Sequence, residues 1–198
     1  RRAGADDAER AVERANAAGI DNISLDLMLG LAGQSTESVG RSIEFCRRLG
    51  AKHLSAYLLK LEQGTPLYTR RNELHLPDED ETAELYLFTA SEAAKNGFLQ
   101  YEISNFSLPG YESRHNLKYW RCEEYLGVGA AAHSFVGGKR FYNERSIADF
   151  LEGKPPINDG DGGDEEEFVM LALRLTEGLS GERFAERYGH MLPREFDK

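Results

Sequence analysis

The stretch that decides the fold runs from Ile23 to Leu61 and reads ISLDLMLGLAGQSTESVGRSIEFCRRLGAKHLSAYLLKL. Its first seven residues alternate as a strand, with apolar side chains on one face and Asp26 on the other. An amphipathic helix is expected from about Thr36 to Leu49, followed by a second strand from His53 to Leu61. A helix between two strands predicts a parallel βαβ unit, in which ligands bind at the carboxyl ends of the strands.

The same alternation continues on both sides of this unit. Residues 5–18 are predicted to form a helix that ends at Gly19, and another helix starts at Pro77 and Asp78 and ends at Gly97. The strand Leu99 to Phe106 comes next. The first half is therefore of the α/β class, built as in a barrel or an open sheet. Because it begins with a helix and no preceding strand, its order indicates the later part of a larger repeat.

Two features at the first strand suggest a ligand site. Asp26 lies in the middle of the strand, where burial without a partner would cost several kcal/mol. We therefore expect a polar cavity, a cation or a ligand beside it, or else a capping role on a neighbouring loop. The loop from Gly30 to Ser35 follows at the strand's carboxyl end, but it lacks the Lys-Ser/Thr of a phosphate-binding loop.

Aromatic, cationic and histidine residues are concentrated between Leu99 and Phe135. The predicted strand there carries polar side chains that need partners if they are buried. If Asn116 onward is helical, His115 and Tyr119 lie one turn apart, with cationic side chains nearby. An imidazole, aromatic rings and cations together suit a carboxylated tetrapyrrole. The structural alternative places Tyr119 and Trp120 in the core and binds His115 to a loop carbonyl.

The segment from Gly127 to Ala132 has the form Gly-x-Gly-x-x-Ala of a dinucleotide turn. The βαβ context that such a turn requires is missing. The preferred interpretation is a tight bend of small residues that lets a large group approach closely and presents His133 beside it.

The last third of the sequence is predicted to form short strands and helices. A strand from Lys139 to Asn143 and a helical turn from Ile147 to Leu151 are expected. The acidic run from Asn158 to Asp164 is predicted to be a flexible loop, and Gly163 replaces an oxygen ligand that a calcium loop would need. Asp164 should cap a helix, and a second helix should span Gly181 to Tyr188. The predicted domains are residues 1–110, 111–157 and 158–198, the last being small and mainly helical.

Composition excludes several classes of function. The 198 residues are 40% hydrophobic and 29% charged, enough for a real core, and the net charge of −10 argues against nucleic-acid binding, including a helix-turn-helix role for the C-terminal helices. No apolar run approaches a membrane span and residues 1–7 lack an apolar signal region, so a cytoplasmic protein is expected. Cys46 and Cys122 are too few and too far apart for a zinc site, a disulfide framework or an iron–sulfur cluster.

Five motifs in order resemble the oxygen-independent coproporphyrinogen III oxidase-like family of radical SAM proteins. The fourth, His-Asn-x-x-Tyr-Trp, resembles the HemW branch of haem chaperones. The motifs are LDLMLGLAGQS (Leu25–Ser35), HLSAY (His53–Tyr57), QYEISNF (Gln100–Phe106), HNLKYW (His115–Trp120) and LGVGAAAHS (Leu126–Ser134). The resemblance implies the later half of a radical SAM partial (β/α) barrel with parallel strands, followed by a small, mainly helical C-terminal domain.

The resemblance also implies cofactors. In this family a [4Fe-4S] cluster on a Cys-x-x-x-Cys-x-x-Cys loop cleaves S-adenosylmethionine. This sequence does not contain that loop, so the chain alone should generate no radical. S-adenosylmethionine contacts are implied for Asp26, Lys60 and His133. Haem contacts are implied for the fourth motif, with His115 as the iron ligand; its four matching residues are His115, Asn116, Tyr119 and Trp120.

Two functions from different classes follow from the resemblance. A chaperone would hold haem and pass it to haem-acceptor proteins. An oxidase would use a 5′-deoxyadenosyl radical to decarboxylate propionates of coproporphyrinogen III to vinyl groups. A third alternative is an inactive scaffold fragment. The homodimer stays open as well, because a strand edge without its preceding neighbours can associate with a second copy.

Overall fold

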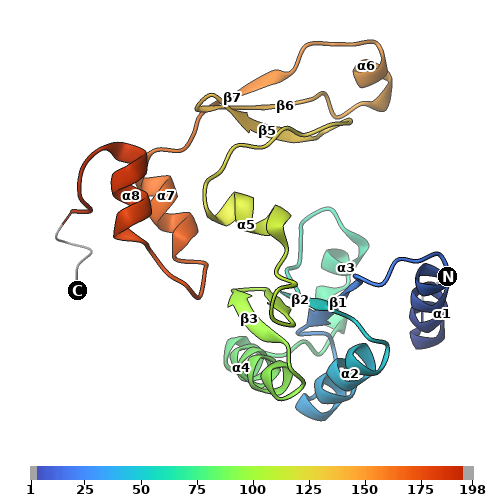
Figure 1. The fold of residues 1–198 in the computed structure, drawn as a ribbon. Coiled ribbons are helices and arrows are strands. Elements are labelled where there is room, and N and C mark those ends of the chain that lie inside the picture. Colours follow the sequence, from blue (N-terminus) through green and yellow to red (C-terminus); the bar gives the residue numbers. More distant parts are fainter. Residues whose placement is uncertain (1–3, 194–198) are drawn as a thin grey trace. The chain divides into compact units, whose positions relative to one another are not determined.

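A computed structural model describes residues 4–193 of the chain (Figure 1). Residues 1–3 and 194–198, which are the outer ends of the first and last predicted domains, lie outside the described residues. The chain divides into two compact units, the first extending to Glu112 and the second beginning at Ser113. The finer division at residues 110 and 157 stays a prediction.

The first unit is a mixed α/β layer structure. Strands β1 and β2 are parallel and joined through α2, which confirms the predicted βαβ unit. The sheet order is β1-β2-β4-β3. Its elements are α1 (Ala5–Ala17), β1 (Ser24–Leu29), α2 (Thr36–Arg48), β2 (His53–Leu58), α3 (Pro66–Thr69), a 3-10 turn (Arg71–Glu73), α4 (Glu79–Lys95), β3 (Leu99–Glu102) and β4 (Asn105–Ser107).

Helices α2 and α4 begin and end where their local sequence dictates. The Ser35 hydroxyl accepts a hydrogen bond from Ser38 N (3.3 Å) at the start of α2, and the Asp78 carboxylate accepts one from Glu81 N (2.8 Å) at the start of α4. Gly50 follows α2 with a φ of 76°, a left-handed conformation that suits glycine after a helix. The predicted helix positions are confirmed to within a few residues.

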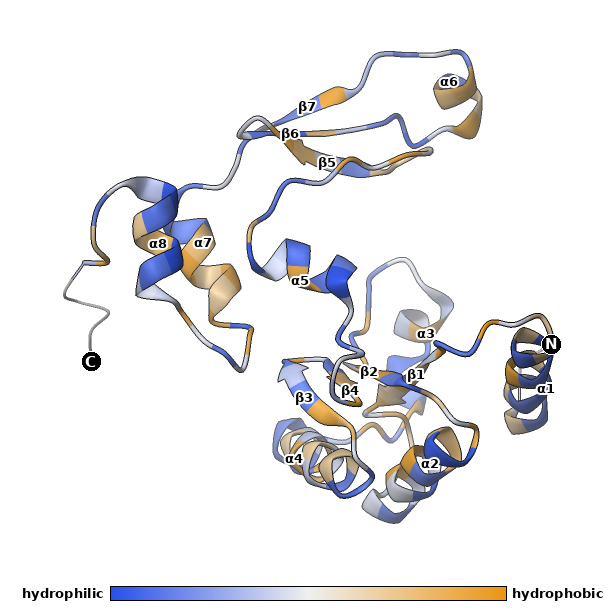
Figure 2. Cartoon of the chain, in the orientation of Figure 1, coloured by the Kyte–Doolittle hydropathy of each residue, from blue (hydrophilic) through white to orange (hydrophobic). Residues whose placement is uncertain are grey.

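Helices α2 and α4 pack against one face of the sheet, and both carry hydrophobic and hydrophilic residues in Figure 2. The apolar residues of alternate strand positions meet these helices, as period-two strands require. The buried core residues of this unit are Leu29, Val39, Ile43, Cys46, Ala51, Leu54, Ala56, Leu85, Ala93, Phe98 and Phe106. Polar side chains of the strands lie on the opposite face of the sheet.

The prediction of one strand from Leu99 to Phe106 is wrong. The segment forms a hairpin, in which β3 and β4 are antiparallel and β4 is also antiparallel to β2. The Glu102 carboxylate stabilises the turn of this hairpin, because its Oε1 accepts a hydrogen bond from Ser104 N (2.9 Å) and another from the Asn105 amide. These bonds close a tight turn at Ile103 and Ser104 and give the Glu102 carboxylate and the Asn105 amide nitrogen a partner, whereas the buried Asn105 Oδ1 has no hydrogen-bond partner among the described residues.

The second unit combines a helix, a three-stranded antiparallel sheet and a helix pair. The sheet order is β5-β6-β7, and one apolar core contains Cys122, Phe135, Phe168, Val169 and Phe184. The elements are α5 (Arg114–Trp120), β5 (His133–Val136), β6 (Lys139–Tyr142), α6 (Ile147–Leu151), β7 (Ile157–Asp161), α7 (Glu165–Ala172) and α8 (Gly181–Tyr188). None of the helices between residues 4 and 193 has the length and apolar character that a membrane crossing requires.

The acidic run is only partly a loop, so the prediction for Asn158 to Asp164 is wrong in its first half. Residues up to Asp161 form strand β7, which pairs with β6. Backbone pairing with β6 and an ion pair between Lys139 and Asp161 hold this acidic strand in the sheet. The predicted cap is confirmed, because the Asp164 carboxylate accepts a hydrogen bond from Glu167 N (2.8 Å) at the start of α7.

Candidate functional site

Four polar residues form a row across the sheet of the first unit, on the face away from α2 and α4. The register places Asp26 opposite Ser55, Ser55 opposite Asn105, and Asn105 opposite Glu102. Residues directly opposite each other in neighbouring strands share a face. We call this set the polar row. Its members on β2, β4 and β3 are buried, whereas Asp26 is exposed on the edge strand β1.

His53 stands beside the polar row in a hydrogen-bonded chain. Its Nδ1 lies 2.8 Å from Ser24 Oγ and its Nε2 lies 2.8 Å from the hydroxyl of Tyr101. Both ring nitrogens of this buried imidazole are therefore satisfied. The sequence interpretation missed this residue as part of the site. The signal was a histidine opening a strand that is otherwise mostly apolar.

We expect the stability of the first unit to fall as the pH drops below about 6.5, the ordinary pKa of histidine. Burial lowers the pKa of His53, and the charges of Asp26 and Glu102 only partly oppose this. Below the ordinary pKa the unfolded chain therefore binds a proton that the folded chain refuses, so acid favours unfolding. Urea unfolding followed by circular dichroism, on either side of that pH, should show a smaller acid loss in His53→Gln than in the wild type. An equal loss of unfolding free energy in acid for the wild type and for His53→Gln would contradict the expectation.

The two residues implied for S-adenosylmethionine in this unit are not joined to each other by a hydrogen bond or ion pair. Asp26 borders an open cavity of about 580 Å³ at the free edge of β1. Lys60 follows β2 and pairs with Glu62 (Nζ to Oε1 3.1 Å), and its side chain is 84% exposed. Both positions are open to solvent, and their predicted contacts stay predictions.

The loop after β1 is closed by its own glutamine, which the sequence interpretation also missed. Gln34 Oε1 accepts hydrogen bonds from Gly30 N (2.7 Å) and Leu31 N (3.3 Å), and its Nε2 donates to Met28 O (2.8 Å). These two backbone amides are thus occupied and do not point at an anion. A phosphate at Gly30 to Ser35 would therefore lack two of the backbone donors of the loop.

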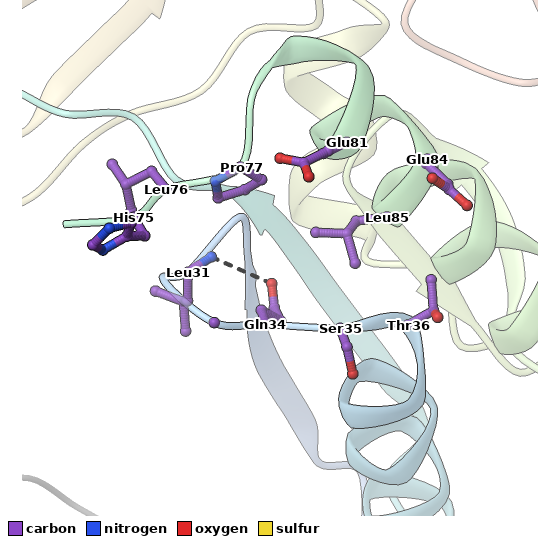
Figure 3. A pocket seen from close by; sticks show the side chains of 11 residues that line it. Leu31, Gln34, Ser35, Thr36, His75, Leu76, Pro77, Glu81, Glu84 and Leu85 are labelled. Atoms are coloured by element: carbon purple, nitrogen blue, oxygen red, sulfur yellow. Dashed lines mark hydrogen bonds between the residues drawn. The ribbon is translucent and has the colours of Figure 1, made fainter.

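A pocket of about 410 Å³ lies between this loop and the start of α4. Figure 3 shows Leu85 reaching from α4 toward the loop that carries Gln34, and the hydrogen bond from Leu31 N to Gln34. The polar side chains of the pocket include His75, Glu81 and Glu84. Two carboxylates disfavour a phosphate here.

In the second unit, α5 brings His115 and Tyr119 together as the spacing predicts. Ser113 caps the helix by accepting a hydrogen bond from Asn116 N (3.3 Å). His115 Nε2 lies 2.8 Å from the Tyr119 hydroxyl, and the rings meet edge to face with centroids 4.9 Å apart. His115 is exposed, so one nitrogen and one oxygen donor are presented together at the surface.

Further side chains of the same unit pack against Tyr119 and restrict its ring. Its ring meets that of Tyr125 edge to face with centroids 4.5 Å apart. The Tyr125 hydroxyl accepts a hydrogen bond from Arg140 Nη1 (3.2 Å), and Arg140 Nη2 donates to Glu167 Oε1 (2.6 Å). Burial, with Tyr125 adding to it, raises the pKa of the Tyr119 phenol. Tyr119 is therefore the anchored member of the pair.

Trp120 belongs more to the packing of the unit than to its surface. The Arg174 guanidinium carbon lies 4.1 Å from the centre of its ring, a cation–π contact. Its indole Nε1 is buried and has no hydrogen-bond partner among the described residues. Asn116 donates its backbone N–H to the Ser113 hydroxyl at the start of the helix. The haem contacts of both residues stay predictions.

The small-residue bend before His133 is tight, and it is fixed by the sheet. Gly127 N donates to Ser134 Oγ (3.0 Å), and the Asn143 amide donates to Gly129 O (2.9 Å). His133 is half exposed, stacks on Tyr142 (centroids 5.0 Å apart) and has its Nδ1 3.6 Å from Asp159 Oδ2. The bend presents an exposed imidazole, and its contact with S-adenosylmethionine stays a prediction.

Both cysteines are free, buried thiols. Burial raises the pKa of the Cys46 thiol to about 11, and burial also raises the pKa of Cys122. Thiols bind metals as thiolates, so the raised pKa values disfavour metal binding by these two residues. Between residues 4 and 193 no group of three or more His, Cys, Asp or Glu side chains could hold a metal ion.

Comparison with known proteins gives a consistent set of relatives. The chain is 41% identical over 190 residues to the haem chaperone HemW of Bacillus subtilis, covering 91% of this chain and 50% of that protein. It is 38% identical over 185 residues to HemW of Lactococcus lactis, covering 89% of this chain and 49% of that protein. The chain thus spans about half the length of these relatives. No family model matches the chain.

A solved structure supports the fold. Coproporphyrinogen III oxidase (HemN) from Escherichia coli, described as a radical SAM enzyme, superposes with a TM-score of 0.73 at 14% identity, covering 96% of this chain and 49% of that one. This likeness shows the fold, while the sequence identities to the HemW proteins indicate the branch. The chain therefore belongs to the HemN/HemW family of radical SAM proteins, in its HemW branch.

Proposed function

We propose that this chain is the haem-binding part of a haem chaperone that passes haem to acceptor proteins. The observation that carries the proposal is the exposed pair of His115 and Tyr119 on α5, which offers iron a nitrogen and an oxygen side by side. Two relatives at 41% and 38% identity are named haem chaperones. Haem acts here as the cargo of the protein.

The surroundings of the pair suit a carboxylated macrocycle. Arg114 precedes His115, is exposed and makes no ion pair within residues 4–193, so it is available to a propionate. Lys118 is half exposed and only loosely paired with Glu123 (Nζ to Oε2 3.5 Å). The partly exposed ring of Tyr119 on the same helix adds contact area for a flat ligand.

S-adenosylmethionine and a [4Fe-4S] cluster belong to the proposal as cofactors of the whole protein. Asp26, Lys60 and His133 are the proposed contacts to S-adenosylmethionine, since all three present exposed polar atoms. Cluster ligands would come from outside this sequence, because both of its cysteines are buried thiols. A cytoplasmic location and a homodimer stay predictions.

The alternative activity is the oxidation of coproporphyrinogen III. It is supported by the fold of HemN alone, at 14% identity. No side chain among the described residues favours decarboxylation over binding, so the chaperone is the function we propose.

The proposal predicts saturable one-to-one binding of haem by this chain, followed as a shift of its Soret band. His115→Ala should weaken the affinity roughly tenfold, a loss of about 1.4 kcal/mol, because the nitrogen member of the pair is removed. His75→Ala is the matched control, since His75 is an exposed histidine of the first unit and should leave the titration unchanged. Equal, weak binding by all three proteins would refute the assignment.

A further inference from the structure

The hydrogen bond within the pair bears on which of its atoms binds iron. Tyr119 Oη and His115 Nε2 are 2.8 Å apart, so the lone pair or proton of that nitrogen is engaged. Ligation through Nε2 would have to break this bond. Ligation through Nδ1 would bring the iron next to the Cβ of His115 and the helix. The observed arrangement therefore does not present the imidazole as the ready ligand.

The phenol oxygen can bind a metal without losing its hydrogen bond to His115, although burial raises the pKa of Tyr119 and the iron must displace the phenol proton. A hydroxyl carries two lone pairs and one proton, so Tyr119 Oη can accept a metal while it stays hydrogen-bonded to His115. Its ring is also the better fixed of the two. The ring of Tyr125 packs against it with the two ring centroids 4.5 Å apart. Arg140 donates hydrogen bonds to both the Tyr125 hydroxyl and Glu167. A tyrosine side chain fixed in this way needs little reorganisation when it binds the haem iron.

We propose that Tyr119 Oη binds the haem iron and that His115 is a positioning residue that takes up the phenol proton. This inference rests on the proposed function and deepens it. The iron–oxygen bond forms, the O–H bond breaks, and the proton moves to His115 Nε2, which then donates a hydrogen bond to the bound oxygen. No electron is transferred. Phenolate is a hard, anionic ligand, so the site selects ferric over ferrous haem.

The test is a titration of this chain with ferric haem and, under a reductant, with ferrous haem. Resonance Raman spectra of the ferric complexes report iron–phenolate vibrations. Tyr119→Phe keeps the ring contact with Tyr125 and removes only the oxygen. We expect it to lose the phenolate bands and at least about tenfold in ferric affinity, with little change for ferrous haem. Tyr111→Phe is the matched control, because Tyr111 is an exposed phenol of the first unit.

His115→Ala separates positioning from ligation. If His115 only accepts the proton and hydrogen-bonds the oxygen, the variant should bind ferric haem more weakly, keep the phenolate bands and shift their frequency. Phenolate bands that are absent from the wild type, or that persist in Tyr119→Phe, would overturn the inference. In that case binding that still depends on His115 would leave the proposed function standing. A wild type that binds no haem saturably would refute the proposed function as well.

Discussion

Gly127→Ala should lower the free energy of unfolding of the second unit by about 2–3 kcal/mol. A Cβ at this position would lie 2.2 Å from the backbone oxygen of His133 and 3.0 Å from the Cβ of Ala132. The first of these atoms is backbone, so it cannot turn away as the end of a side chain could. Relief requires the bend to open, which strains the hydrogen bond from Gly127 N to Ser134 Oγ.

The measurement is urea unfolding followed by tryptophan fluorescence. Trp120 is the single tryptophan and lies in the second unit, so its signal reports that unit. Gly181→Ala is the control: this residue begins α8, a Cβ added to it would meet no atom within 4 Å, and alanine there should be neutral or slightly stabilising. A loss below about 0.5 kcal/mol for Gly127→Ala would show that the bend tolerates a side chain.

The bend also explains why the dinucleotide pattern appears here without a dinucleotide fold. The glycine at position 127 serves a close backbone approach within the chain itself, between the segment that follows Tyr125 and the start of β5. Close approach to a cofactor and close approach to another strand demand the same residue. Sequence alone indicates the need for glycine, and only the fold identifies the partner.

Sequence periodicity is sufficient for the long elements and insufficient for the hairpin. The βαβ unit follows from period-two and period-3.6 patterns with clear caps, which are local signals. The split of residues 99–106 depends on a long-range outcome, the antiparallel pairing of β4 with β2. A continuous alternating pattern cannot reveal that a carboxylate folds back onto the residues that follow it.

The candidate site likewise combines local contacts that the sequence predicts with tertiary contacts that it does not. The contact of His115 with Tyr119 is predictable, because one helical turn fixes it. The support of Tyr119 by Tyr125 and Arg140 is not, because it joins α5 to a strand of the sheet through tertiary packing. Likewise the bond from His53 to Tyr101 joins residues 48 positions apart, which no spacing rule reaches.

Glu102→Ala should destabilise the first unit by about 3 kcal/mol. Glu102 is 0% exposed, and its Oε1 accepts hydrogen bonds from Ser104 N and the Asn105 amide. Truncation to alanine leaves both donors without this acceptor and also leaves a cavity. Because Ser104 O accepts a hydrogen bond from Ala56 N (2.7 Å), loosening the turn also weakens the attachment of the hairpin to β2.

Two variants separate the hydrogen bonds from the charge. Glu102→Gln keeps an oxygen acceptor of nearly the same shape, so it should lose less than the alanine variant if acceptance is what matters. Glu44→Ala, on the exposed face of α2, should stay within about 0.5 kcal/mol of the wild type. Urea unfolding by circular dichroism gives the free energies, and hydrogen exchange at the Ala56 amide reports the hairpin directly.

The difference between the alanine and glutamine variants also decides what the polar row is for. If both are equally harmful, the negative charge of Glu102 is required, and the row joins the exposed carboxylate of Asp26 in attracting a cationic ligand. If glutamine is tolerated, Glu102 acts as a turn-closing acceptor and Asp26 alone carries the charge of that face. The hydrogen-bond geometry favours the second outcome, since the bonds from Ser104 N and the Asn105 amide both fall on one oxygen that an amide can reproduce.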